Sequence, residues 1–210
     1  MFRRSDFKNA AKLQLQGKWG NAVLTTFIVE LFLFVASILA GLLPFVGGVA
    51  GLILAGPVEI GFIIYFMVIV KGTEIPDVSV AFRGFRYFEK TLGIYLWVVL
   101  WVLLWSLLFI IPGIIKAISY SQAFYIVADN PNVKVRDALK MSMRMTKGYK
   151  WDIFIMGLSF LGWALLCLFS LLIGFLWLTP YMMTSYTNMY FWLKNDSLQS
   201  GACSAAEFEV

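Results

Sequence analysis

Long apolar runs separated by short polar connections dominate this sequence. They cover about residues 21–43, 49–70, 91–111, 113–127, 151–174 and 180–193. A run near 20 residues spans a bilayer core as a helix, which rises about 1.5 Å per residue and satisfies its own backbone hydrogen bonds. The mean hydropathy is +0.80 and only 14% of the residues are charged, against roughly 25% in a typical soluble domain. The sequence therefore predicts an all-α integral membrane protein with six transmembrane helices.

A basic amphipathic segment precedes each pair of apolar runs, at about residues 7–17, 78–90 and 135–147. Apolar residues recur along each at i+3 and i+4, and basic residues occupy another side, which is typical of helices at a membrane interface. Their cations could contact anionic lipid headgroups or an acidic partner, or could serve topology and interfacial packing alone. The candidates for such contacts are Arg83, Arg86, Arg136, Lys140, Arg144 and Lys147.

The six runs therefore form three predicted hairpins, with their turns near residues 42–48, 112–113 and 175–180. These turns carry no charged residue, whereas the three basic segments all fall on the opposite side of the predicted bundle. Because cytoplasmic segments are enriched in Lys and Arg, we expect both termini in the cytoplasm. The predicted location is a bacterial plasma membrane, crossed several times.

The three hairpins also look like copies of one unit. Repeat units of about 7–72, 78–130 and 135–195 would together form a single polytopic domain over residues 1–196. Convergence on a generic hairpin pattern is the alternative. Residues 197–210 are small, polar and acidic, and we expect a flexible tail there.

Three ionisable residues interrupt the apolar runs: Glu30, Glu59 and Lys116. Each lies about 10 residues from the predicted cytoplasmic edge, hence roughly 15 Å deep and near the middle of a ~30 Å core. Charges at that depth usually face the bundle interior and pair, so we expect a contact between Glu59 and Lys116. The pair could form a polar site for an ion, a proton or a lipid headgroup. It could equally be a structural ion pair, or the acids could stay protonated.

Several polar residues could extend this mid-membrane site, or could simply form ordinary hydrogen bonds between helices. They are Tyr120, Ser121, Gln122, Thr184 and Asn188.

The sequence contains no recognisable pattern of catalytic or metal-binding residues. The chain has no histidine, which is the commonest general base and metal ligand, and its two cysteines have no metal-binding spacing. We expect no enzyme activity, no metal and no cofactor. The formal net charge of +5 fits membrane topology, and no nucleic-acid partner is expected.

Five short motifs are of a kind found in a known family. They are Lys18-Trp19-Gly20, Ile111-Pro112-Gly113-Ile114, Tyr120-Ser121, Asp137 to Ser142, and Thr146-Lys147-Gly148. On these motifs the chain resembles, over about residues 5–194, uncharacterised bacterial integral membrane proteins, known only as a domain of unknown function. That family is similar to the membrane domain attached to some glycerophosphodiester phosphodiesterases. Their catalytic domain has no counterpart here, so the resemblance implies the fold and no activity.

Two functional hypotheses follow. The first is a non-enzymatic transport or transport-accessory protein that uses the mid-membrane polar site. The second is a membrane scaffold or regulatory protein that binds anionic lipid or a partner through its basic helices, in envelope stress or peptide resistance. Besides the bilayer and its anionic lipids, a second copy of the chain or another membrane protein would be the natural partner.

Overall fold

The computed structural model describes residues 2–41, 46–72 and 75–209, and every regular element in these ranges is a helix. The long helices are α2 (Trp19–Gly41), α3 (Val46–Lys71), α4 (Phe88–Leu108), α5 (Ile110–Asp129), α7 (Lys150–Phe169) and α8 (Phe175–Gln199). The shorter ones are α1 (Arg4–Leu15), the 3-10 helix η1 (Val78–Tyr87), α6 (Val135–Met145) and α9 (Ala205–Glu209). The predicted all-α class is confirmed.

Five of the described helices are long and apolar enough to cross a membrane, as judged by length and composition. They cover Trp19–Gly41, Gly51–Lys71, Val78–Leu107, Ile110–Asp129 and Lys150–Phe169. These candidate spans indicate a multi-pass membrane protein. The predicted sixth span at residues 180–193 lies within α8, which has 25 residues but is not among the five candidates.

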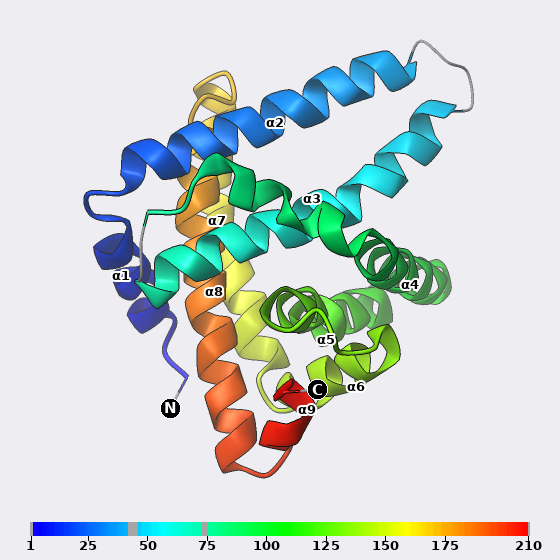
Figure 1. The fold of residues 1–210 in the computed structure, drawn as a ribbon. Coiled ribbons are helices and arrows are strands. Elements are labelled where there is room, and N and C mark those ends of the chain that lie inside the picture. Colours follow the sequence, from blue (N-terminus) through cyan, green and yellow to red (C-terminus); the bar gives the residue numbers. More distant parts are fainter. Residues whose placement is uncertain (1, 42–45, 73–74, 210) are drawn as a thin grey trace.

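The three pairs of consecutive long helices, α2–α3, α4–α5 and α7–α8, point in different directions instead of lying parallel. In Figure 1 the α2–α3 pair runs across the view, the α7–α8 pair runs along its height, and α4 and α5 are seen nearly end-on. One short helix precedes each pair along the chain: α1, η1 and α6. The predicted boundaries of three repeat units stay a prediction.

Two of the predicted turns lie several residues too late. The chain breaks between α4 and α5 at Phe109, whose backbone is extended (φ −155°, ψ 138°), and Pro112 falls in the first turn of α5. Proline is tolerated there because the first turn of a helix needs no backbone donors. The last turn lies at residues 170–174, and Pro180 is inside α8. Part of the first turn, residues 42–45, lies outside the described ranges.

Glycines on α3 allow other elements to pack very close to it. A Cβ atom at Gly61 would collide with the carbonyl group of Ala81 on η1, and one at Gly84 of η1 would collide with the carbonyl group of Pro57. A Cβ atom at Gly56 would lie 2.6 Å from the carbonyl oxygen of Thr91 on α4. These contacts place η1 and α4 against α3 at backbone distance.

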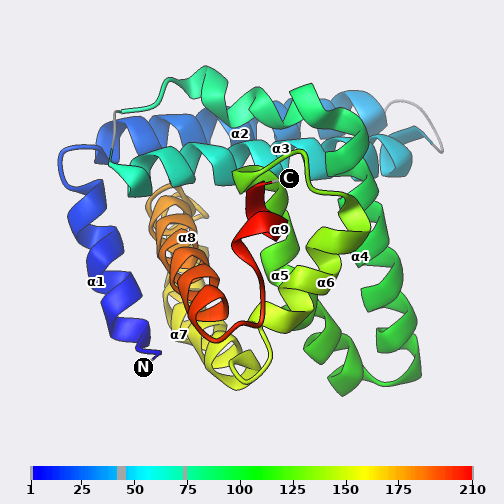
Figure 2. The same cartoon turned by 60° about the horizontal axis from the view of Figure 1, so that its bottom comes forward.

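The segment predicted as a flexible tail has a definite place in the structure. Helix α8 continues to Gln199, and α9 follows after a turn. In Figure 2, α9 lies between the end of α8 and the α5–α6 region. Phe208 is buried there and belongs to the same core cluster as Tyr190 and Leu139. Its mobility in solution stays a prediction.

Candidate functional site

A cavity of about 690 Å³ lies where α3, α5, α7 and α8 meet. Its walls are mostly apolar and aromatic, and Glu59 of α3 is the acidic residue among them. The residues that line it include Ile114, Ile118, Ser121, Gln122, Phe124, Tyr125, Phe154, Gly157, Leu158, Met183, Tyr186 and Met189. We call it the Glu59 cavity.

The packing of α3 directs Glu59 toward this cavity. Pro57 and Gly61 contact η1, and at 100° per residue they fall on the side of α3 opposite Glu59. The flanking Val58 and Ile60 are 4% and 0% exposed, whereas Glu59 keeps an exposed surface. The close approach of η1 therefore fixes the rotation of α3 that presents this carboxyl group to the cavity.

Helix α5 supplies further polar side chains to the wall of the Glu59 cavity. Gln122 is only 1% exposed, and its Nε2 donates a hydrogen bond to Ser121 Oγ at 3.0 Å. Its carbonyl oxygen Oε1 accepts no hydrogen bond within the part of the chain that the structure describes. A buried acceptor without a donor is costly, and such groups are rare in proteins. The Gln122 side chain thus lies in the wall of the Glu59 cavity with its carbonyl oxygen buried.

Lys116 does not face Glu59, so the predicted contact between them is wrong. The described salt bridges do not include this pair, and the Lys116 ammonium instead lies 5.4 Å from the ring centre of Trp105 and 5.6 Å from that of Tyr120. Lys116 and Tyr120 share one side of α5, while Ile118 and Gln122 share the opposite side. Equal depth along two helices was therefore an insufficient criterion, because it leaves their rotation undetermined.

Glu30 and Asn188 also lie away from the cavity. Glu30 is exposed on α2 and does not line it. Asn188 pairs with Gln14 of α1: its Nδ2 donates to Gln14 Oε1 at 2.6 Å and its Oδ1 accepts from Gln14 Nε2 at 3.1 Å. Of the predicted central residues, only Glu59 lines the cavity. Of the predicted extensions, Ser121 and Gln122 do.

Tyr125 and Tyr186 were not predicted, although both line the cavity. A signal for Tyr125 was present, because it follows Ser121 and Gln122 at i+4 and i+3 on the same side of α5. No comparable signal marked Tyr186, whose place depends on how α8 packs against α7.

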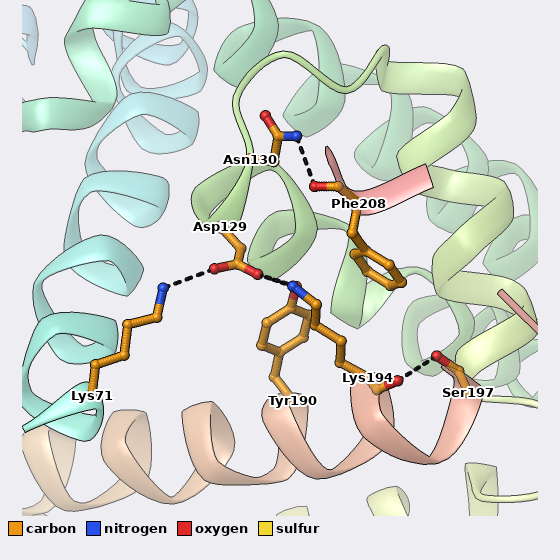
Figure 3. Close-up of polar contacts among 7 residues, drawn as sticks. All are labelled: Lys71, Asp129, Asn130, Tyr190, Lys194, Ser197 and Phe208. Carbon is orange, nitrogen blue, oxygen red and sulfur yellow. Dashed lines mark hydrogen bonds and ion pairs between the residues drawn. The ribbon is translucent and has the colours of Figure 1, made fainter. Parts of the chain in front are cut away.

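A second carboxylate, Asp129, joins the ends of α3, α5 and α8 (Figure 3). Its Oδ1 is 3.0 Å from Lys71 Nζ, and its Oδ2 is 2.5 Å from Lys194 Nζ and accepts a 3.2 Å hydrogen bond from the Tyr190 hydroxyl. The side chain is only 10% exposed. Figure 3 also shows the ring of Phe208 beside Lys194, and the ammonium lies 4.5 Å from its centre. This Asp129 junction was absent from the predicted site residues.

The predicted basic residues divide between two places. Lys140, Arg144 and Lys147 line a groove of about 740 Å³ along α6, with Lys134 and Asp137, and Glu207 of α9 closes one side. We call it the α6 groove. Arg136 is exposed on α6 but does not line the groove, and Arg83 and Arg86 are exposed on η1.

The comparison with known families identifies one match. The model of a family described as "Protein of unknown function (DUF975)" matches residues 1–119 and 107–197. No curated protein and no solved structure matches the chain. Since the two matches together cover more than half of the sequence, the chain belongs to the DUF975 family of proteins of unknown function.

Proposed function

We propose that this chain is a non-enzymatic transport or transport-accessory protein of a bacterial plasma membrane, and that it binds lipophilic organic cations in the Glu59 cavity. The observation that carries the proposal is the charge of the cavity wall. Among the described residues that line the cavity, Glu59 is the one Asp, Glu, Lys or Arg. A carboxylate in such surroundings is costly unless a cation compensates it, and the chain supplies none there.

The size and walls of the cavity support an organic cation over a bare metal ion. A volume of about 690 Å³ falls within the range of roughly 300–1,000 Å³ that accommodates drug-sized ligands. The rings of Phe124, Tyr125 and Tyr186 can face a ligand's positive charge, and Met183 and Met189 supply adaptable apolar contact.

The proposal includes α8 as a sixth span, with both termini in the cytoplasm. Its low hydropathy comes partly from hydroxyl side chains that are already satisfied. Thr184, Ser185 and Thr187 are fully buried, and each hydroxyl donates to the carbonyl group four residues earlier, at 2.7–2.8 Å. Hydroxyl groups that bond to their own helix backbone are compatible with a membrane interior. Six spans then place the basic segments on one side, as the positive-inside rule expects.

Binding of tetraphenylphosphonium to the purified chain in neutral detergent would test the cavity. We expect Glu59→Gln to weaken binding at least tenfold, about 1.4 kcal/mol, because the variant keeps the shape and removes the charge. Glu30→Gln is the matched control, since Glu30 is an intramembrane acid outside the cavity. Tetraphenylborate has nearly the same shape and the opposite charge, and the wild-type chain should bind it more weakly than the cation.

A steric variant tests the location independently of charge. A Cβ atom at Gly157 would lie 3.5 Å from the Tyr186 hydroxyl, an ordinary contact distance, so Gly157→Leu should fill space in the cavity without a backbone collision. Weaker tetraphenylphosphonium binding with normal thermal stability is expected. Equal binding of the cation and the anion, or equal losses in Glu59→Gln and Glu30→Gln, would refute the proposal.

A further inference from the structure

The α6 groove gathers cations on one side of a short helix. Lys140 and Arg144 are four residues apart on α6 and share a face of this helix, and Lys147, just beyond its end at Met145, lines the same groove. All three are exposed, while Val133 and Met141 on the groove's wall are buried. The groove therefore combines a cluster of positive charge with apolar walls, at about 740 Å³.

Helix α6 belongs to a connection between two candidate spans. Helix α5, a candidate span, ends at Asp129, and the next candidate span begins at Lys150. Helix α6 lies between these two residues. Clusters of Lys and Arg in such connections are the usual contacts of anionic lipid headgroups.

One side of the groove is closed by an acidic side chain from far along the sequence. Glu207 Oε1 is 2.5 Å from Arg144 Nη2, and Glu207 Oε2 accepts a hydrogen bond from the Ser204 backbone N–H at 2.8 Å. The two paired side chains remain 43% and 36% exposed, Arg144 and Glu207 respectively. Exposed ion pairs of this kind contribute little to stability. The pair can therefore exchange for another anion.

The rest of this segment is anchored by different contacts. Phe208 is buried, its backbone carbonyl accepts a hydrogen bond from Asn130 Nδ2 at 2.8 Å, and the backbone N–H of Cys203 donates to the Ser197 carbonyl at 3.1 Å. Cys203, near the start of this segment, is 3% exposed. These contacts hold the segment in place, and the carboxylate of Glu207 therefore lies against Arg144 when no ligand is bound.

We propose that the α6 groove binds the headgroup of an anionic phospholipid, and that Glu207 occupies Arg144 as an internal competitor until the lipid phosphate displaces it. The Arg144 guanidinium can pair with two phosphate oxygens, and Lys140 and Lys147 line the same groove. The half-buried Met143, which also lines the groove, receives the first acyl carbons. Displacement of Glu207 removes one of the contacts that hold the segment 201–209, so Cys203 becomes exposed more often. This site is separate from the Glu59 cavity.

Native mass spectrometry of the full chain in neutral detergent would measure the binding of dioctanoyl phosphatidylglycerol against that of dioctanoyl phosphatidylcholine. We expect preference for the anionic lipid, about a fivefold loss in Arg144→Gln, and about a threefold gain in Glu207→Gln, which removes the competitor. Arg86→Gln on η1 is the matched control and should bind like the wild type. Both Arg side chains are exposed, so none of these changes threatens folding.

A second experiment measures how often the segment 201–209 leaves its docked position. Its readout is the rate at which N-ethylmaleimide alkylates Cys203 in a Cys167→Ala background. It should rise in Glu207→Gln and on addition of phosphatidylglycerol, and phosphatidylcholine should leave it unchanged. An unchanged affinity in Glu207→Gln, or an equal loss in Arg86→Gln and Arg144→Gln, would overturn the proposal. Displacement of the lipid by millimolar inorganic phosphate would overturn the lipid as the ligand in favour of a free phosphate.

Discussion

Asp129 and Glu59 are carboxylates on two helices that both help to form the Glu59 cavity, yet their surroundings differ. Asp129 contacts two lysines and a tyrosine hydroxyl, all supplied by the chain itself. Glu59 forms no ion pair with any described residue and faces a cavity. The contrast shows that a charge inside this fold indicates a binding site only when the chain leaves its partners missing. We therefore propose that Asp129 serves stability and that Glu59 serves ligand binding.

Asp129→Asn should have the largest effect on stability. The change removes the counter-charge of Lys194 and Lys71, and loss of a mostly buried paired charge typically costs several kcal/mol. Because Lys71 is 52% exposed, we expect the lower end, about 2–3 kcal/mol. Thermal unfolding in detergent would measure it. Glu59→Gln should change the same transition by less than about 0.5 kcal/mol, and similar losses in both variants would end the distinction between the two carboxylates.

Gly61→Ala should lower stability and cation binding together. The added methyl group would collide with the Ala81 carbonyl on η1, and overpacking of this kind costs about 1–3 kcal/mol. Since the η1 contact fixes the rotation of α3, the relief of this collision should also displace Glu59. Gly51→Ala is the control on the same helix, because no atom of the described residues lies within 4 Å of its Cβ position. A fully stable Gly61→Ala chain with normal tetraphenylphosphonium binding would contradict this role for η1.

A third carboxylate, Glu207, extends the contrast to an exposed pair and should show the smallest effect. The hydrogen bond from Arg144 lowers the pKa of Glu207 below its ordinary value of 4.5, and the Ser204 backbone N–H lowers it further. A lowered pKa means that docking of the segment 201–209 is fully supported above the ordinary value and weakens as pH falls through the lowered one. The expected change is less than about 1 kcal/mol, because the pair is exposed.

Fluorescence anisotropy of a probe at Ala205→Cys, in a chain with both native cysteines replaced by alanine, would follow this release between pH 7 and pH 3. Anisotropy should fall at the acidic end in the parent chain. The same titration of Glu207→Gln should be flat over this range. A parent chain with no acidic transition would show that the Arg144 contact does not hold the segment.

The apolar runs and basic segments were sufficient to predict apolar helices of a membrane protein. The hydropathy of each segment can be read from its own residues, and it decides whether that segment favours the bilayer or water. Turn positions were less certain. Pro112 and Pro180 suggested breaks, whereas the structure accommodates one in the first turn of α5 and the other inside α8. A proline marks a missing donor, and the neighbouring packing decides whether a helix ends there.

Glu59 could be selected from the sequence as a buried charge, but its partners could not. The prediction that Lys116 would pair with it used depth alone, and the rotation of α5 turns Lys116 toward Trp105 and Gln122 toward the cavity. Likewise, no local pattern in residues 197–210 predicted that Phe208 would be buried or that Glu207 would contact Arg144. The sequence by itself determined which segments are helical and apolar. Only the tertiary structure decided which side chains meet, because helix rotation and contacts between distant segments depend on packing across the whole chain.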